Sequence, residues 1–469
     1  MKKGDKLENL LIEGMAAEGK CLAKVDGMVV FLNGGAPGDT VEAIITKSKK
    51  SFLEARVTNV IHHSPQRSIP FCDHFDTCGG CTWQHINYET QLSFKEKQVR
   101  DNLERIGGLA LPEVLPIKGS EHTREYRNKL DFTFTDSQWL TWEELKTDKI
   151  KGPGLGYHIP KMFDKVFDLD KCHLQPSPSN EIRQHVKKLS LDHRIPFFNL
   201  RSQTGFLRTL TIRTASTGEV MIILQVTEDK KKWIDLILSS VAELFPQVTS
   251  INYVVNSKRN DTFHDLPVIT WRGNSYITEK MPRPNEEGDL QFRVGPKSFY
   301  QTNSEQAFHL YKIAWQFAAL TGKELVYDLY TGTGTIANFV AADAAKVVGL
   351  EYVADAIADA KVNSQINDIT NTAFFSGDIK DLLDDRFLSE HGRPDVIITD
   401  PPRAGMHEDV CKMILKAEPE RIVYVSCNPA TQARDLKILS EKYSIDRVQP
   451  VDMFPHTMHV ENVVRLIRI

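Results

Sequence analysis

The sequence predicts three units in one chain: a small β-barrel over residues 1–65, a strand-rich α/β unit over 66–290 and a doubly wound α/β unit over 291–469. Its 469 residues suffice for about three domains of roughly 150 residues each. Short alternating runs separated by turn residues fill the first 65 positions, which favours a barrel. After about residue 290, continuous apolar runs alternate with helical stretches, a pattern typical of a parallel sheet covered on both faces.

The composition is that of an ordinary folded protein. Apolar residues make up 41% and charged residues 26% of the chain, so disorder is not expected. No run approaches about 18 apolar residues, and the first 20 residues lack the apolar core of a secretory signal. We therefore expect no membrane span and a cytoplasmic location. A net charge of −4 excludes a uniformly basic nucleic-acid binder, although one domain can still have a basic face.

The predicted barrel carries a group of cations on its later strands. Its apolar runs, such as GKCLAKV and TVEAIITKS, are broken at Asp26-Gly27 and again at residues 33–35. The cations are Lys47, Lys49, Lys50 and Arg56. They form either a solvated face or a patch that contacts phosphates.

The central unit begins with a predicted helix. Residues 88–108 place Leu92, Val99, Leu103 and Ile106 at helical spacing on one stripe, and Gly107-Gly108 is a stop signal. We expect this helix to pack on the C-terminal unit. From about 120 to 290 the runs are strand-rich, for example NKLDFTF and EVMIILQV.

Polar residues at the strand ends of the C-terminal unit predict a nucleoside pocket, because ligands of such sheets bind at the carboxyl ends of the strands. The first strand ends in a loop containing Gly332 and Gly334, which allow a close backbone approach. Glu351 follows the second strand, 19 positions after Gly332, where an acid can accept both ribose hydroxyls. Asp378 can hold an adenine amino group, and Asp400 ends a further strand. The alternative is that these acids only cap the helices that follow.

The glycine loop suits a nucleoside with a small charged tail better than a dinucleotide. It lacks the third glycine of the G-x-G-x-x-G fingerprint and has no Gly-Lys-Ser/Thr. Here the sequence resembles the class I methyltransferases, which have a Rossmann-like sheet and use S-adenosylmethionine.

Cys427 is the candidate nucleophile. It lies where a strand ends and a helix begins, a place where the pKa of a thiol can be lowered. A lone cysteine is more often a buried structural residue, and Cys411, in the apolar stripe of a helix, fits that description. Cys427 differs from a buried structural cysteine because it lies at a site-forming strand end among Ser426, Asn428 and Pro429.

Three motifs together resemble the RNA uridine-5-methyltransferase family. They are DPPRAG from Asp400 to Gly405, YVSCNPAT from Tyr424 to Thr431, and HVE from His459 to Glu461. The resemblance spans nearly the whole chain. It implies that residues 1–65 form a TRAM domain, an OB-fold-like RNA-binding barrel, and that residues 291–469 form a class I methyltransferase domain.

The reaction implied by the resemblance needs a nucleophile and a base. Carbon 5 of uracil becomes nucleophilic only after a thiolate adds to carbon 6, and its proton must leave after methylation. Cys427 is the expected nucleophile, and the resemblance makes Glu461 the base, which would need burial to reach a useful pKa. His456 and His459 compete for the role of base. Asp400 is expected to orient the uracil ring.

The resemblance also implies the cofactor residues. Phe299–Asn303 opens a helix in a segment that reaches over the cofactor in the family, so Gln301 is carried over as a binding residue. Thr335 stands where many members have asparagine, and Thr331 where many have cysteine. The full expected set is Gln301, Tyr330, Gly332, Thr335, Glu351, Asp378 and Asp400.

Four cysteines predict a metal or cluster site. Cys72, Cys78 and Cys81 crowd together and Cys172 follows, a set of thiols that suits a [4Fe–4S] cluster or zinc. The C-x5-C-x2-C spacing matches no common zinc signature. The resemblance implies the family's iron–sulfur segment in the central unit, with a structural or RNA-docking role.

The expected partner is RNA, and 23S ribosomal RNA is favoured over tRNA because family members that act on tRNA generally lack the barrel and the cluster. The target uridine must lie in a loop or be flipped out of its stack. Arg124, Tyr126, Arg127 and Lys129 are candidates for the RNA path; the alternative is an ordinary charged strand edge. We expect a monomer.

Two other functions remain open from the sequence. Asp-Pro-Pro also begins the motif of enzymes that methylate exocyclic nitrogens, which need no covalent thiol. A non-catalytic RNA chaperone or assembly factor with a vestigial cofactor pocket would need only the barrel and the basic stretch. Replacement of Cys427 would leave an enzyme that methylates exocyclic nitrogens active but would inactivate a uridine methyltransferase. Measurement of S-adenosylmethionine binding tests for the non-catalytic RNA chaperone or assembly factor.

Overall fold

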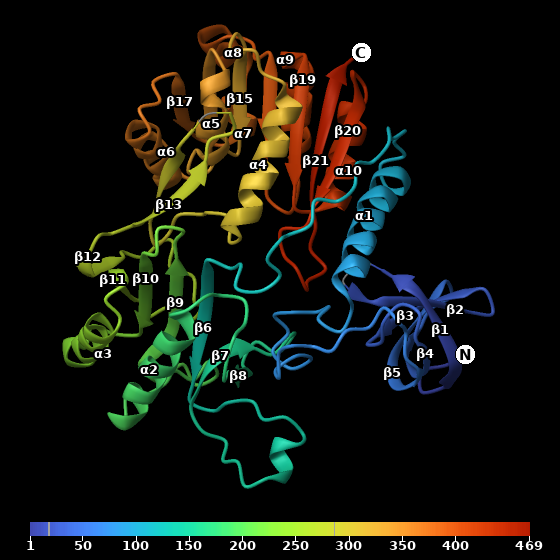
Figure 1. The fold of residues 1–469 in the computed structure, drawn as a ribbon, viewed down its shortest axis with the longest axis vertical. Helices are drawn as coiled ribbons and strands as arrows, with labels where there is room; N and C mark the ends of the chain where they lie inside the picture. The colour runs from blue at the N-terminus through green and yellow to red at the C-terminus, as the bar shows by residue number, and fades with distance from the viewer. Residues whose placement is uncertain (17–18, 286) are drawn as a thin grey trace.

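The computed structural model describes residues 1–16, 19–285 and 287–469. The barrel and the central unit lie side by side, and the C-terminal unit lies above them in Figure 1. Within the described residues, no helix combines the length and the apolar character needed to cross a bilayer.

The N-terminal unit is a closed five-stranded barrel, as its alternating runs predict, with strand order β1-β2-β3-β5-β4. Its strands are β1 (Lys6–Met15), β2 (Cys21–Val25), β3 (Met28–Asn33), β4 (Thr40–Ser48) and β5 (Phe52–His62). Every second side chain of β3 and β4 points inward, so that Val30, Leu32 and Val41 are fully buried. Closure removes the free strand edges that would otherwise be exposed.

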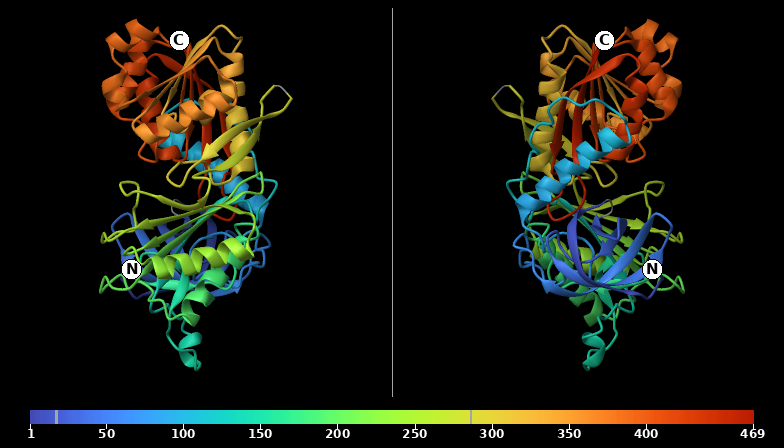
Figure 2. Two further views of the ribbon diagram at one scale, coloured as in Figure 1. Left: turned by 90° about the vertical axis from the view of Figure 1, so that its left-hand side faces the viewer. Right: turned by 90° about the vertical axis from the view of Figure 1, so that its right-hand side faces the viewer.

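The central unit is a seven-stranded sheet in the order β12-β11-β10-β9-β6-β7-β8. Its strands are β6 (Lys129–Thr135), β7 (Gly154–His158), β8 (Val166–Asp168), β9 (Leu207–Thr214), β10 (Val220–Val226), β11 (Val248–Val255) and β12 (Ile269–Gly273). Its helices are α2 (Ser179–Asp192) and α3 (Lys231–Leu244), with a short η2 (Glu144–Lys146) in a long loop. Both helices lie on the same side of the sheet in Figures 1 and 2. Every residue of β10 is buried, because strands flank it on both sides and both of its faces are covered.

The C-terminal unit is a seven-stranded sheet in the order β17-β16-β15-β18-β19-β21-β20, in which β15 to β19 are parallel and β21 is antiparallel. Its strands are β15 (Leu325–Leu329), β16 (Lys346–Glu351), β17 (Thr372–Ser376), β18 (Val396–Thr399), β19 (Arg421–Ser426), β20 (Tyr443–Val451) and β21 (Glu461–Arg468). Its helices are α4 (Ser304–Ala318), α5 (Thr335–Val340), η3 (Ala341–Asp343), α6 (Ala354–Ile366), α7 (Ile379–Leu382), α8 (Asp385–His391), α9 (Glu408–Ala417) and α10 (Pro429–Leu439). Two apolar cores cover the sheet: Val326 and Val423 belong to one, Tyr327 and Ile422 to the other.

The expected boundary at residue 290 falls inside a strand. β13 (Ile277–Pro282) and β14 (Asp289–Val294) form a hairpin whose inward residues, such as Met281 and Phe292, share a core with Val326 and Ala360 of the C-terminal unit. This hairpin therefore packs as part of the C-terminal unit. The change of sequence pattern near residue 290 could not predict this packing. The alternating residues of the hairpin have the same pattern as the strands of the central sheet that precede it.

The helix expected at 88–108 is α1 (Tyr88–Arg105), which starts at Asn87, whose side chain accepts a hydrogen bond from the Thr90 N–H. Val99 and Leu103 are fully buried in the same core as Ile422. The helix thus packs on the C-terminal unit although it precedes the central sheet in sequence. Ile106 was expected on the buried stripe, but it is 51% exposed because it follows the last turn.

Candidate active site

The expected site residues lie along one edge of the C-terminal sheet. Leu350 of β16 pairs with Leu329 of β15, and Leu329 pairs with Thr399 of β18. The residues that follow these strands are therefore neighbours, and they include Glu351, Tyr330 and Asp400. In Figure 1 this edge faces the central unit, and the loop between β20 and β21 extends from it.

Cys427 and Glu461 are brought together by the register of two antiparallel strands. Ser426 of β19 pairs with Asn462 of β21, so that Cys427 and Glu461 occupy the next positions on the facing strands. Gln432 of α10 fixes this pairing, because its side-chain amide donates to the Tyr424 and Asn462 carbonyl oxygens and accepts from the Asn462 side chain at 2.7 Å. The site therefore holds a thiol beside a carboxyl at the end of the sheet.

The thiol of Cys427 is not acidic in the unliganded protein. Burial, together with the nearby carboxylates of Glu461 and Asp400, raises its pKa to about 11, while Arg403 acts in the opposite direction. The sequence led us to expect a lowered pKa from the helix that follows. That expectation is wrong for the free protein, because desolvation and two acids outweigh one helix terminus.

Glu461 is the group whose pKa best suits a base near neutral pH. It is buried, and burial followed by the charge of Asp400 raises its pKa to about 8. Burial, together with neighbouring cations, lowers the pKa values of His456 and His459 to about 4. A base is most effective when its pKa lies near the working pH, so the geometry favours Glu461 over both histidines.

Asp400 stands at the head of a rigid loop. Burial raises its pKa to about 7. The Arg403 carbonyl oxygen accepts hydrogen bonds of 3.1 Å from the side chains of Asn428 and Thr431 at the start of α10. A Cβ on Gly405, at φ +77°, would lie 2.6 Å from an oxygen of Asp435, so this turn needs glycine.

The loop after β15 is shaped by glycine and by Glu351. The Gly332 N–H donates to the Glu351 carboxylate at 3.1 Å, and the same carboxylate accepts from the Val353 N–H at 2.9 Å. Tyr330 has a φ of +64°, a strained value for a residue with a side chain. A Cβ on Gly332 would meet no atom within 4 Å, whereas at Gly334 it would lie 2.9 Å from Ala360. Open space thus adjoins Gly332, as a ligand-binding loop requires.

The remaining expected cofactor residues differ in their surroundings. Gln301 is buried and bonds the Tyr311 phenol, and its own carbonyl oxygen accepts from Asn128 of the central unit at 2.8 Å. Thr335 is buried at the start of α5. Asp378 accepts from the Lys380 N–H at the start of α7 and forms a salt bridge with the Lys380 ammonium at 3.0 Å, as the capping alternative predicts.

Three desolvated carboxyls, of which Asp328 and Glu461 are buried and Asp400 is partly exposed, make this edge electronegative once they ionise. Burial raises the pKa of Asp328 to about 7, of Asp400 to about 7 and of Glu461 to about 8. Burial raises the pKa of the Tyr311 phenol, and all three carboxyls act in the same direction. Desolvated acids of this kind favour a cationic ligand, since a nearby positive charge stabilises their ionised forms.

Known proteins resemble this chain over its full length. A family model described as tRNA (Uracil-5-)-methyltransferase matches residues 269–469, and a TRAM domain model matches residues 6–58. An uncharacterized RNA methyltransferase of Bacteroides thetaiotaomicron is 55% identical over 457 residues, which is 96% of this chain and 99% of the relative. A relative with the same description in Porphyromonas gingivalis is 54% identical over 97% of this chain and 99% of its own length. The chain belongs to the RNA uracil-5-methyltransferase family.

A solved structure agrees with this family. The Pyrococcus abyssi tRNA (uracil-54, C5)-methyltransferase, in complex with S-adenosyl-L-homocysteine, is 29% identical and superposes with a TM-score of 0.74 over 97% of this chain and 99% of its own. The protein is thus an S-adenosylmethionine-dependent RNA methyltransferase with an N-terminal TRAM barrel.

The four cysteines of this methyltransferase line one cavity. Cys72, Cys78, Cys81 and Cys172 surround it with Tyr157, whose hydroxyl lies 3.8 Å from the Cys172 Sγ. All four are free thiols. In residues 1–16, 19–285 and 287–469, however, no set of three or more His, Cys, Asp or Glu side chains is arranged to hold a metal ion. The chain therefore brings the four thiols together around one cavity.

One proposed RNA-contacting residue is not available to RNA. Tyr126 is buried and donates to the Pro455 carbonyl oxygen at 3.0 Å, so its ring cannot stack on a base. Arg124 lies over the Phe71 ring at 4.0 Å, and Arg127 over the Phe454 ring at 5.1 Å. The sequence could not separate Tyr126 from its neighbours, because the partner carbonyl is 329 positions away.

Sequence reasoning missed the residues that support the site from outside the sheet. Lys95 of α1 is fully buried and pairs with the Asp452 carboxylate at 2.6 Å. Tyr88 donates to the other oxygen of Asp452 at 2.8 Å. Lys95 and Tyr88 lie on α1 at spacings that fit any amphipathic helix, so no sequence signal marks them as buried polar partners.

Proposed function

We propose that the protein methylates carbon 5 of a uridine in RNA through a covalent bond between Cys427 and carbon 6 of the base. The observation that carries the proposal is the adjacency of Cys427 and Glu461 at the ligand-binding edge of the sheet. A methyltransferase acting on an exocyclic nitrogen has no use for this pair of groups.

The residues would act in a fixed order. S-adenosylmethionine supplies an electrophilic methyl group. The Cys427 thiolate adds to carbon 6, and the electron pair of the double bond makes carbon 5 nucleophilic. After carbon 5 is methylated, Glu461 takes its proton, the double bond re-forms and the Cys427 sulfur leaves as thiolate. The Cys427 thiol has a raised pKa in the free protein. Formation of the thiolate therefore needs the positive charge of the sulfonium nearby.

The cofactor and base contacts are also proposals. Glu351 would accept the ribose hydroxyls while holding the Gly332 N–H, and Asp378 would receive the adenine amino group. Gln301, Tyr330, Gly332 and Thr335 would complete the cofactor pocket. Asp400, held on the loop that Asn428 and Thr431 fix, would contact both the cofactor and the uracil ring.

Two classes of RNA are candidate substrates. The TRAM barrel and the cysteine segment led us to favour 23S ribosomal RNA. The Pyrococcus abyssi tRNA enzyme covers 97% of this chain at a TM-score of 0.74, so a barrel does not by itself separate the two classes. We keep 23S ribosomal RNA as the first candidate and tRNA as the second. Methylation of purified 23S and tRNA transcripts, with mapping of the product by mass spectrometry, decides between them.

A [4Fe–4S] cluster is the proposed ligand of Cys72, Cys78, Cys81 and Cys172. The proposal is supported by four free thiols on one cavity and by the family resemblance. No step of methyl transfer needs an electron, so we propose that the cluster orders the polypeptide or docks RNA. Anaerobic purification followed by iron and sulfide analysis and visible absorption tests it, and zinc without iron would contradict it. We further propose that the enzyme acts in the cytoplasm as a monomer.

The replacement of Cys427 by serine tests the proposed mechanism. We expect turnover to fall by several orders of magnitude while S-adenosylmethionine still binds, because the pocket acids are unchanged. Undiminished methylation by the variant would favour an amino-group methyltransferase. Absent S-adenosylmethionine binding by the wild-type protein would favour the non-catalytic assembly factor.

A further inference from the structure

The loop of residues 452–460, between β20 and β21, is held by segments from outside the C-terminal unit. It is the stretch of chain that leads directly to Glu461. The cysteine segment (residues 72–83) reaches it through two backbone bonds, since the N–H groups of Thr82 and Trp83 both donate to the His456 carbonyl oxygen, at 2.8 and 3.0 Å. His456 has a φ of +63°, so its peptide is fixed in an uncommon conformation.

Gln91 of α1 connects the loop to the cysteine segment. It is fully buried, and its side-chain NH₂ donates to the carbonyl oxygens of Trp83 at 3.0 Å and Ile86 at 2.8 Å and lies 3.2 Å from His456 Nδ1. Its side-chain oxygen accepts from the His456 N–H at 2.9 Å. One amide thus pairs with backbone groups of both partners, and its removal would leave these buried groups without a partner.

Lys95, one turn further along α1, holds the beginning of the same loop. Its ammonium group contacts the Asp452 carboxylate at 2.6 Å and the Phe454 carbonyl oxygen at 3.1 Å. Helix α1 itself is fixed to the sheet through Val99 and Leu103. The 452–460 loop therefore has a rigid support on one side and the cysteine segment on the other.

The cysteine segment has little structure of its own to offer as a support. Residues 63–87 form no helix or strand apart from one bridge between Arg67 and Ile86. Its conformation depends on local turns and on the cavity where the four thiols meet. A change in the order of that cavity would therefore alter the support of His456, which lies five positions before Glu461.

We infer that Gln91 is a positioning residue for Glu461, and that it transmits the order of the four-cysteine cavity to the base through the 452–460 loop. The inference rests on the proposed function, in which Glu461 removes the carbon-5 proton. It gives the cysteine site a role in a reaction that transfers no electron.

The test uses Gln91→Ala in the full-length enzyme, with Gln98→Ala on the same helix as the matched control. RNA carrying 5-fluorouridine forms a covalent complex whose release needs loss of fluorine, so its formation depends on Cys427 but not on a base. We expect Gln91→Ala to form this complex at a rate close to that of the wild type, while turnover of ordinary RNA falls about 10–100-fold. This loss is smaller than the rate enhancement of about 10²–10⁴-fold that a general base typically contributes, because the base itself is still present. Hydrogen exchange in residues 452–460 should rise in Gln91→Ala and in wild-type enzyme stripped of iron, with no further rise when both changes are combined.

Equal loss of complex formation and turnover in Gln91→Ala would overturn the inference, and so would unchanged exchange in the loop. Gln91→Glu keeps the acceptor for the His456 N–H but places an oxygen against the Trp83 and Ile86 carbonyl oxygens, so it should not restore the turnover of the wild type. A failure of the proposed function is recognised separately, because then wild-type enzyme forms no complex with 5-fluorouridine RNA.

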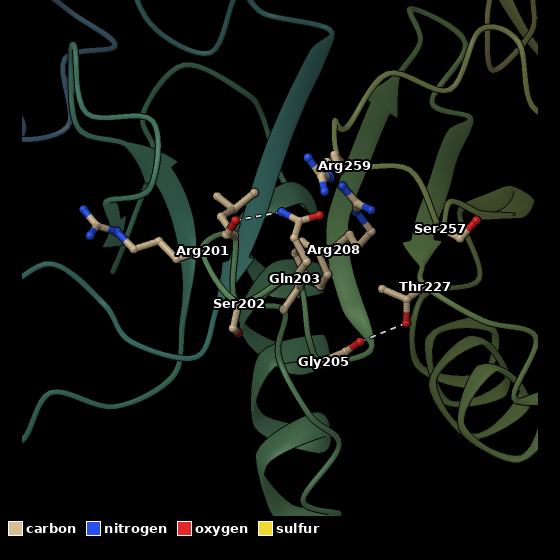
Figure 3. Close-up of a pocket in the computed structure, with 10 residues that line it drawn as sticks. Arg201, Ser202, Gln203, Gly205, Arg208, Thr227, Ser257 and Arg259 are labelled. Atoms are coloured by element: carbon tan, nitrogen blue, oxygen red, sulfur yellow. Dashed lines mark hydrogen bonds between the residues drawn. The ribbon is translucent and has the colours of Figure 1, made fainter.

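A hollow in the central unit supports a second, independent inference. It has a volume of about 800 Å³ and lies where β9 begins and where β10 and β11 end (Figure 3). It is lined by Phe198, Leu200, Arg201, Ser202, Gln203, Gly205, Arg208, Thr227, Ser257 and Arg259. The lining includes three arginines, of which Arg201 pairs with Asp164 and Arg208 with Asp261, so that Arg259 carries the uncompensated charge.

The walls of the hollow are fixed before any ligand arrives. Arg208 is 1% exposed and donates to the carbonyl oxygens of Asn256 at 2.9 Å and Asn260 at 3.0 Å and to the Asp261 carboxylate at 2.7 Å. These bonds shape the loop that carries Arg259. On the opposite wall, a Cβ on Gly205 would lie 2.3 Å from the Phe197 carbonyl oxygen, so the loop closes only with glycine.

We propose that this hollow binds a phosphate of the substrate RNA at a distance from the target nucleotide. Arg259 is exposed and forms no salt bridge with any residue in the described part of the chain, so its charge is available to a ligand. The eight residues of β9 lead from the hollow to Thr214, whose N–H bonds Asn128 beside Gln301. At about 3.4 Å per residue, the hollow lies roughly 25 Å from the catalytic unit, a span that a folded RNA covers.

The binding of 23S and tRNA transcripts by Arg259→Ala and Arg259→Glu, measured between 50 and 300 mM salt, tests the proposal. We expect Kd to rise about 3–10-fold for Arg259→Ala and more for Arg259→Glu, and the salt slope to fall by about one. Arg386→Ala, on α8 at the far end of the molecule (Figure 1), is the charge-matched control and should change neither. Unchanged Kd and slope in both Arg259 variants would overturn the proposal. A thermal shift with inorganic phosphate that depends on Arg259, without an effect on RNA, would also overturn it in favour of a small free anion.

Discussion

The pH dependence of methyl transfer tests Glu461 and Cys427 together. Burial raises the pKa of the Glu461 carboxyl to about 8, and burial with two neighbouring acids raises that of the Cys427 thiol to about 11. Both groups must lose a proton before they can act. The experiment measures kcat/KM between pH 6 and pH 9 for the wild type and for Glu461→Gln, since this quantity reports the pKa values of the free enzyme.

The expected slopes follow from the two pKa values. At pH 7 about one in ten Glu461 carboxyls and about one in 10⁴ Cys427 thiols is ionised. Each unit of pH below 8 raises both fractions about tenfold, so kcat/KM should rise about 100-fold per unit; above pH 8 only the thiolate fraction rises, and the slope should fall to about tenfold. In Glu461→Gln the slope should be about tenfold throughout, on a rate reduced by about 10²–10⁴.

Glu408→Gln, an exposed acid on α9, is the control and should keep the wild-type profile. A wild-type profile that is flat from pH 6 to pH 9 would refute the reasoning. A Glu461→Gln profile with the same break at pH 8 would refute the assignment of that break to Glu461.

Three further predictions concern stability and ligand binding. Lys95→Met should lower the free energy of unfolding, measured by urea titration, by about 3–5 kcal/mol, because it leaves the buried Asp452 carboxylate without its cation. The control Lys97→Met, which removes an exposed pair with Asp101, should change this free energy by less than about 1 kcal/mol. Affinity for S-adenosylmethionine should increase between pH 6 and pH 8 more than affinity for S-adenosylhomocysteine does, since the carboxyls of Asp328, Asp400 and Glu461 ionise in that range and attract the sulfonium; equal increases by calorimetry would contradict this. Cys411→Ala should retain methylation, because the side chain is fully buried in the apolar core, and loss of activity with an intact fold would show that it has a role in the site.

Much of the site could be predicted because it follows from the geometry of parallel strands. Glu351 and Asp400 end neighbouring strands, so their place in the chain fixes their place at the sheet edge. The antiparallel pairing that places Glu461 beside Cys427 has no such local signal, and only the family resemblance indicated it. Asp378 illustrates the limit of the argument, since it also caps α7 as the alternative predicts.

The features that sequence could not predict depend on partners far along the chain. Gln91 contacts a residue 365 positions away, and its burial does not follow from helical spacing. The raised pKa of Cys427 results from two acids that other strands bring beside it. The core that the β13–β14 hairpin joins could not be predicted either, because a hairpin pattern carries no information about the residues that it packs against.

The central claim is a transient bond between the Cys427 sulfur and the uracil ring, and mass spectrometry of a trapped complex tests it most directly. Wild-type enzyme incubated with S-adenosylmethionine and RNA that carries 5-fluorouridine should yield one tryptic peptide containing Cys427 with a methylated fluorouridine nucleotide attached. No complex at all, or a nucleotide attached to any other residue while ordinary RNA is methylated at carbon 5, would contradict the account.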